Sequence, residues 1–81
     1  KAMLDLIWNG VILQISRPTT KHLMSQHGKL IAFCNGEAYL KVPSLPIFRM
    51  AREKLPDVEA AFKKAFGYNV KDSLVIGKTR N

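Results

Sequence analysis

The chain of 81 residues has room for one hydrophobic core, and its apolar fraction of 47% and charged fraction of 23% are those of a globular rather than a disordered protein. Its single cysteine excludes an internal disulfide, and no apolar run approaches the ~18 residues of a membrane span, so we expect a cytoplasmic domain with no membrane contact. The chain starts at Lys1 rather than Met, which suggests that residues 1–81 form a single domain of a longer protein. The net charge of +7 favours either contact with nucleic-acid phosphates or solubility of a domain whose partners are proteins.

Residues 2–16 are predicted to form an amphipathic helix that ends before Pro18. Its apolar side chains recur at helical spacing along one stripe, which consists of Leu4, Ile7, Trp8, Val11, Ile12 and Ile15. Leu6 and Leu13 lie off this stripe, so a second side of the helix is also apolar. Gly10 costs helix stability and suggests that another element approaches the helix closely there.

Trp8 has two interpretations. On the apolar stripe it is expected to be buried against the sheet, because large aromatic side chains usually belong to the core. The functional alternative is that Trp8, Leu6 and Leu13 form an edge that binds a partner protein.

The next segments are a short helix and a hairpin. Thr19 or Thr20 is expected to cap a helix from about Thr20 to Gln26, which Gly28 ends. Asn35-Gly36 between two alternating segments, residues 30–34 and 37–42, is the strongest short-range signal for a two-residue hairpin. On its second strand, Ala38, Leu40 and Val42 are expected to face the helices, which leaves Tyr39 and Lys41 exposed.

A long helix and a last strand follow. Ser44 and Gly67 are the expected caps of the helix, and Pro56 is expected to kink or restart it, with Asp57 in the first turn after that break. Residues 69–76 read as a strand.

The predicted element order is therefore α-α-β-β-α-β, in an α+β fold. The second and third strands are joined through a helix, so we expect them to be parallel, with the first strand between them in the order 2-1-3. Helices would cover one face of this three-stranded sheet. The arrangement is that of a KH-like sandwich.

No motif for catalysis, cofactor binding or metal binding is present in the sequence. His22 and His27 are five residues apart, which does not match the spacing of a helical metal pair, and Cys34 lies beside the hairpin turn. The carboxylates form no pair in a shared apolar site, and the isolated glycines form no phosphate loop. We therefore expect neither an enzyme nor a cofactor.

One aromatic residue lies among basic residues, which is a pattern that can bind nucleic acid. Tyr39, Lys41, Arg49 and Arg52 could lie together and stack on a single-stranded base, although a solvated surface is the simpler explanation of them. KH domains that bind nucleic acid carry a GxxG loop, and no GxxG occurs in this chain.

The order and spacing of the core positions resemble those of a known family. Leu6-Ile7-Trp8, the run from Arg17 to Gln26, the hairpin, Met50-Ala51-Arg52-Glu53-Lys54, and Val58 to Phe62 with Phe66-Gly67 are similar to the C-terminal domain of the bacterial DNA polymerase III gamma/tau (clamp-loader) subunit, over residues 4–76. The chain is also similar to the N-terminal domain of the replication initiator DnaA, which has a tryptophan in its first helix and a proline inside its long helix, as at Pro56.

This resemblance implies a non-catalytic domain of the bacterial replisome. By that likeness its partner would be the DNA polymerase III catalytic subunit or the replicative helicase, to which it would tether the clamp loader. The alternative function is a KH-like domain that binds single-stranded nucleic acid through its basic surface.

Overall fold

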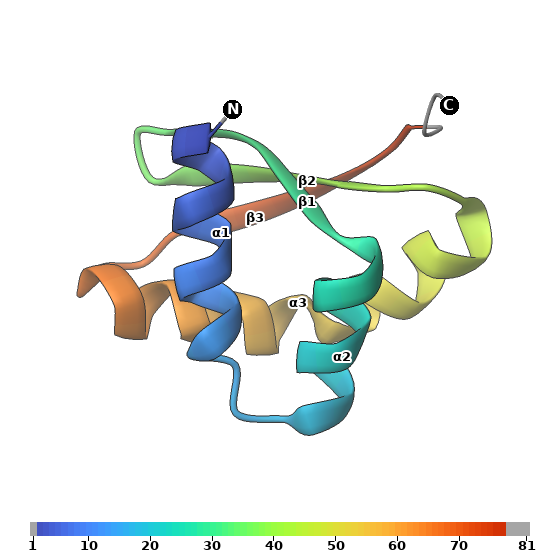
Figure 1. Ribbon diagram of the computed structural model, residues 1–81, viewed down its shortest axis with the longest axis horizontal. Coiled ribbons are helices and arrows are strands. Elements are labelled where there is room, and N and C mark those ends of the chain that lie inside the picture. The colour runs from blue at the N-terminus through green and yellow to red at the C-terminus, as the bar shows by residue number, and fades with distance from the viewer. Residues whose placement is uncertain (1, 78–81) are drawn as a thin grey trace.

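The computed structural model describes residues 2–77 (Figure 1). Its elements are α1 (Ala2–Leu13), α2 (Pro18–His27), β1 (Lys29–Cys34), β2 (Glu37–Val42), α3 (Leu45–Phe66) and β3 (Lys71–Ile76). The predicted element order is therefore confirmed. Lys1, Lys78 and Arg80, which contribute to the net charge, lie outside the described residues.

The hairpin between β1 and β2 has the predicted turn. Asn35 has φ of 54° and Gly36 has φ of 75°, so both central residues adopt the left-handed conformation that a type I′ turn requires. The two strands pair in antiparallel register, with Cys34 opposite Glu37 and Leu30 opposite Leu40. The turn chemistry therefore sets the register of the sheet.

The strand order of the sheet is β1-β2-β3, so the predicted order 2-1-3 is wrong. The expectation that β2 and β3 run parallel is confirmed, but β3 pairs directly with β2, with Tyr39 opposite Ser73. A tight hairpin leaves both of its outer edges free, and the sequence does not reveal which edge the last strand joins. β1 is left as an edge strand, and its register shifts between Leu30 and Ala32, an irregularity that is common at sheet edges. The fold is a small α+β domain with an open mixed sheet, and the predicted likeness to a KH sandwich is not confirmed.

The helices cover one face of the sheet. In Figure 1, α3 runs below the three strands, and α1 and α2 pack against it. Ala38, Leu40 and Val42 point toward the helices and are fully buried, as predicted, whereas Glu37 and Tyr39 on the opposite face are exposed. Lys41 is half-buried rather than exposed, because its aliphatic carbons lie beside Gly77.

The core is centred on an aromatic cluster. Phe62 on α3 is fully buried, and its ring centroid lies 6.2 Å from that of Trp8 and 5.7 Å from that of Phe33. Phe66 extends the cluster toward the end of α3, with its ring centroid 5.1 Å from that of Phe33. These rings join α1, α3 and β1 into one core.

Both ends of α3 are capped as predicted, but the proline inside it does not interrupt it. The Ser44 side chain accepts a hydrogen bond from the backbone N–H of Ile47 (3.4 Å), and Gly67 ends the helix with φ of 84°. The helix continues through Pro56 over 22 residues, so the predicted restart is wrong. Packing of both halves on the same core, through Ala51 and Val58, outweighs the loss of one backbone hydrogen bond.

The two shorter helices differ from prediction at their ends. α1 ends at Leu13 rather than at residue 16, and α2 already begins at Pro18, whose fixed φ suits the first helical turn. Arg17, not a threonine, occupies the N-cap position of α2, and its side chain makes no capping hydrogen bond. Gly28 follows the end of α2 as predicted, although in an extended conformation.

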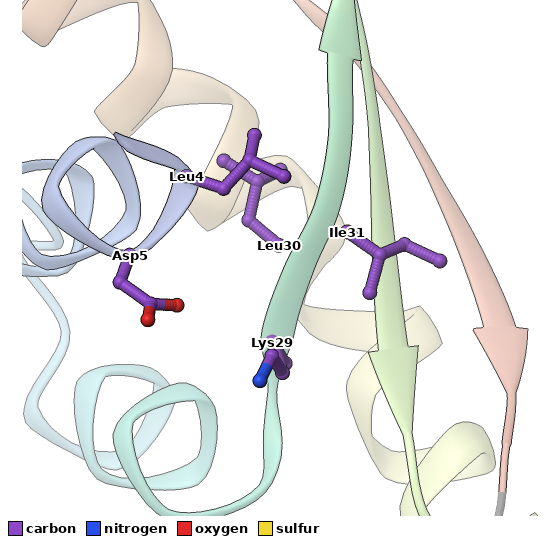
Figure 2. A pocket seen from close by; sticks show the side chains of 5 residues that line it. All are labelled: Leu4, Asp5, Lys29, Leu30 and Ile31. Atoms are coloured by element: carbon purple, nitrogen blue, oxygen red, sulfur yellow. The ribbon is translucent and has the colours of Figure 1, made fainter. Parts of the chain in front are cut away.

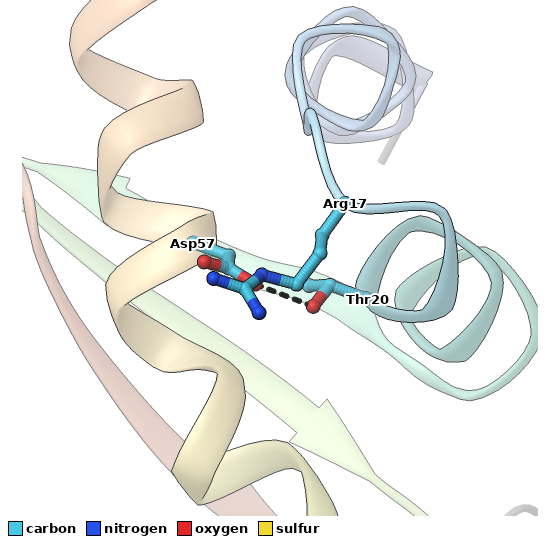
Figure 3. A network of polar contacts seen from close by, with 3 residues as sticks. All are labelled: Arg17, Thr20 and Asp57. Carbon is cyan, nitrogen blue, oxygen red and sulfur yellow. Dashed lines mark hydrogen bonds and ion pairs between the residues drawn. The ribbon is translucent and has the colours of Figure 1, made fainter.

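Thr20 and Asp57 join α2 to the middle of α3 (Figure 3). Thr20 is buried within α2, and its hydroxyl donates a hydrogen bond of 2.6 Å to Oδ2 of Asp57. Arg17 Nε lies 3.2 Å from the same oxygen. Asp57 therefore positions α2 against α3, and the predicted roles of Thr20 as a cap and of Asp57 in a first helical turn are both wrong.

Replacing Gly10 by Ala is expected to stabilise the domain. The structure contradicts the predicted close approach at Gly10, since a Cβ there would meet no heavy atom within 4 Å; the close approach occurs at Gly28, beside the Trp8 ring. Alanine in an exposed helix interior gains up to ~1 kcal/mol over glycine, so urea unfolding should show that gain.

Gly67 provides the matched control for this substitution. A Cβ added at Gly67 would also meet no heavy atom within 4 Å, but the φ of 84° disfavours any L side chain. Gly67→Ala is therefore expected to lose about 1–2 kcal/mol. Equal effects at the two glycines would contradict the assignment of helical backbone to one and left-handed backbone to the other.

Candidate interaction surfaces

The side of α1 that faces away from the core is apolar. Met3 and Leu6 are each 69% exposed and Leu13 is 72% exposed, and these residues follow one another at helical spacing with Gly10 between the two leucines. We call Met3, Leu6, Gly10 and Leu13 the α1 stripe. A helix that is apolar on both its inner and its outer side is typical of one covered on both sides, and within the described residues nothing covers the outer side.

Trp8 does not belong to this exposed surface. It is only 5% exposed, its ring packs on Phe62, and its indole Nε1–H donates a hydrogen bond of 3.1 Å to the carbonyl oxygen of Gly28. The structure thus places Trp8 in the core, where a buried indole usually finds such an acceptor. Of the three residues predicted to form a partner-binding edge, Leu6 and Leu13 are exposed and Trp8 is not.

A second apolar surface is a groove between α2 and the start of α3, with a volume of about 390 Å³. The groove, which we call the α2–α3 groove, is lined by Pro18, Thr19, His22, Leu23, His27, Ile47 and Met50. The sequence gives no sign of this groove, because the residues of two separate helices meet only in the folded chain. Met50, which lines it, is 54% exposed.

A smaller hollow of about 250 Å³ lies between α1 and the edge strand β1 (Figure 2). Leu4 of α1 and Leu30 of β1 approach each other at its floor, and Asp5 and Lys29 lie at its rim. Figure 2 also shows that Ile31 points to the opposite side of β1, away from α1. Successive side chains of β1 therefore divide between the helix-covered face and the open face of the sheet.

The four predicted nucleic-acid residues are not brought together. Tyr39 and Lys41 lie on the open face of the sheet, whereas Arg49 and Arg52 extend from α3, which packs on the other face. The Tyr39 hydroxyl donates a hydrogen bond of 3.2 Å to Oε1 of Glu37, and this bond and the negative charge of Glu37 raise the pKa of Tyr39. These four side chains therefore do not form one shared site.

A buried carboxyl group on β3 was not anticipated from the sequence. Asp72 is 6% exposed, and neither of its carboxyl oxygens has a hydrogen-bond partner among the described residues. Its backbone N–H donates to Oε2 of Glu59 on α3 (3.0 Å). Burial, and secondarily the charge of Glu59, raise the pKa of Asp72 from 3.8 to about 8. Alternation along β3, where Asp72 pairs with buried Ala38, was the signal that could have revealed it.

Residues 2–77 hold no group of three or more histidine, cysteine, aspartate or glutamate side chains arranged to bind a metal ion. His22 and His27 line the α2–α3 groove, while Cys34 is exposed on β1. Over the same part of the chain, no helix combines the length and apolarity needed to cross a membrane.

Comparison with known proteins gives one match. A family model described as "STICHEL, DnaA_N-like alpha-beta domain" matches residues 1–74, which is most of the chain and includes every helix. No curated protein and no solved structure shows a significant match.

Proposed function

Because the chain belongs to the STICHEL, DnaA_N-like alpha-beta domain family, we propose that it is a protein-interaction domain of the DNA-replication machinery. Domains related to the N-terminal domain of DnaA mediate protein–protein contacts in replication, and the family match agrees with the predicted likeness to that domain. In this proposal the domain binds and positions other proteins in the cytoplasm and catalyses no reaction.

The α1 stripe is the observation that carries this proposal. It presents three large apolar side chains, each about 70% exposed, on a helix whose inner side is anchored in the core by Trp8 and Val11. Buried apolar anchors supply most of the free energy of protein binding, and a rigid helix loses little conformational freedom when a partner covers it. Gly10 leaves a notch between Leu6 and Leu13 in which a partner side chain can sit.

The proposal also names two candidate partner proteins. The likeness of residues 4–76 to the C-terminal domain of the polymerase III gamma/tau subunit supports a tether that joins a clamp loader to the polymerase catalytic subunit or to the replicative helicase. The family match supports the relation to DnaA and does not extend to gamma/tau, so the two candidate partners need a direct comparison.

Replacing both Leu6 and Leu13 by Gln is expected to weaken binding to the true partner at least tenfold. The double variant removes two of the three exposed anchors while keeping a similar side-chain length and helix propensity, and each lost anchor costs about 1–2 kcal/mol. Titration calorimetry against the polymerase catalytic subunit and against the helicase measures the effect.

Met50→Gln is the matched control, because it removes an exposed apolar side chain from the α2–α3 groove instead. Binding should be nearly unchanged in this variant. A loss confined to Met50→Gln would transfer the interface to the groove, and the absence of binding to either protein would overturn the proposed partners.

A further inference from the structure

The open face of the sheet is organised around one aromatic side chain. Tyr39 lies on the central strand, and the residues directly opposite it on the two neighbouring strands are Ala32 and Ser73, both small. Small neighbours leave the flanks of the ring accessible, and the ring is 38% exposed. The hydrogen bond from its hydroxyl to Glu37 fixes the direction of the ring along the strand.

The charged side chains on this face are mostly positive. By strand register, Lys71 is opposite Glu37, so Lys41 and Lys71 share the face with Tyr39, whereas Lys29 lies at the rim of the hollow beside α1. Among the residues of the three strands (29–34, 37–42 and 71–76), Glu37 is the one carboxylate on the open face, since Asp72 points to the core. The face therefore has a net positive charge with an aromatic ring at its centre.

The spacing of these groups fits a short stretch of polynucleotide. Lys41 and Lys71 flank Tyr39 on opposite sides, separated by four residue steps along β2, or ~13 Å at the usual rise of a strand. A three-stranded face of this extent holds about two nucleotides, with one base on the ring and the phosphates on either side within reach of the lysines.

We propose that the open face of the sheet binds single-stranded nucleic acid, with a base stacked on Tyr39 and phosphates paired with Lys41 and Lys71. A duplex keeps its bases stacked and presents no free base to the ring, so the single strand is the form that the face fits. The site is distinct from the α1 stripe, which lies on the other side of the sheet. Its test therefore does not depend on the identity of any protein partner.

Fluorescence anisotropy with labelled oligo(dT) and oligo(rU) of about ten nucleotides, and with a duplex of equal length, tests the proposal. We expect both single strands to bind at low salt and the duplex to bind more weakly. Tyr39→Ala should weaken single-strand binding about tenfold, because it removes the stacking platform. Tyr68→Ala is the matched control, since Tyr68 is also exposed but packs on Phe66, on the helix side of the sheet.

A second pair of variants separates the site from general charge. Lys41→Gln with Lys71→Gln and Arg49→Gln with Arg52→Gln each remove two positive charges, but only the first pair lies on the open face. The lysine pair should lower the slope of log K against log salt by about 1.4, because each phosphate contact on a single strand contributes ~0.7, and the arginine pair should change it much less. Equal effects from the two pairs, equal effects from the two tyrosines, or no single-strand binding by the unmodified domain would each overturn the proposal.

Discussion

Asp72→Asn is expected to stabilise the domain by a few kcal/mol at pH 8–9 and to remove most of its pH dependence between pH 4 and pH 8. Asp72 is buried on the inner face of β3 with no hydrogen-bond partner for its carboxyl oxygens among the described residues. Glu59 of α3 accepts a hydrogen bond from the Asp72 backbone N–H, and Lys71 precedes Asp72 on β3. Without a direct cationic partner, the buried carboxyl group favours its neutral form.

The direction of the pH dependence follows from the raised pKa. The folded state holds the proton of Asp72 up to about pH 8, whereas the unfolded state releases it near pH 3.8. Between these values unfolding releases a proton, so the free energy of unfolding falls as the pH rises from 4 to 8. Below pH 4 both states are protonated and the residue contributes no pH dependence, and above pH 8 the full cost of a buried charge is present, on the order of a few kcal/mol.

Urea unfolding of the unmodified domain and of Asp72→Asn, at intervals from pH 4 to pH 9, measures this difference. The difference between the two proteins cancels the contributions of all groups that the substitution leaves unchanged. Glu59→Gln should give a smaller gain, because it removes only the secondary electrostatic cause and keeps an oxygen that can accept from the Asp72 backbone N–H. A constant difference between the unmodified domain and Asp72→Asn across this range would show that Asp72 does not titrate in it.

Local chemistry makes much of this fold predictable. Asn35-Gly36 determines the hairpin turn and Gly67 ends α3, because these residues adopt a positive φ, and Ser44 begins α3 through a side-chain hydrogen bond three residues along the chain. The exposure of Leu6 and Leu13 also follows from helical spacing alone. These features depend on residues within about four positions of one another, whereas the end of α1, the N-cap of α2 and the restart at Pro56 are equally local and are predicted wrongly.

Features that depend on how distant segments meet are predicted poorly. The order of the strands depends on which free edge of the hairpin β3 joins, and nothing local to residues 71–76 specifies it. The contact of Asp57 with Thr20, 37 residues away, leaves no local signal, so the sequence suggests only a place in a helical first turn. Arg49 and Tyr39 are near in sequence, but the sheet separates them.

Phe62→Ala is expected to cost about 3–5 kcal/mol and to leave a substantial fraction of the domain unfolded at 25 °C. The Phe62 side chain is fully buried and contacts the rings of Trp8, Phe33 and Phe66, so its removal opens a cavity where α1, α3 and β1 meet. A domain of this size has only about 4–12 kcal/mol of total stability, so the loss is a large part of it. Urea unfolding followed by circular dichroism and by the fluorescence of Trp8 measures the loss.

Phe66→Ala is the control that separates burial from aromatic content. Phe66 belongs to the same cluster but is 37% exposed, so its removal should cost roughly half as much or less. Phe62→Leu retains most of the buried volume and should remain folded, which keeps the comparison measurable if Phe62→Ala does not fold. Equal losses for Phe62→Ala and Phe66→Ala would mean that the core is centred nearer the end of α3. The helix α1, which carries the α1 stripe, would then be held less firmly against the core, because Trp8 contacts the core through Phe62 and through its hydrogen bond to Gly28.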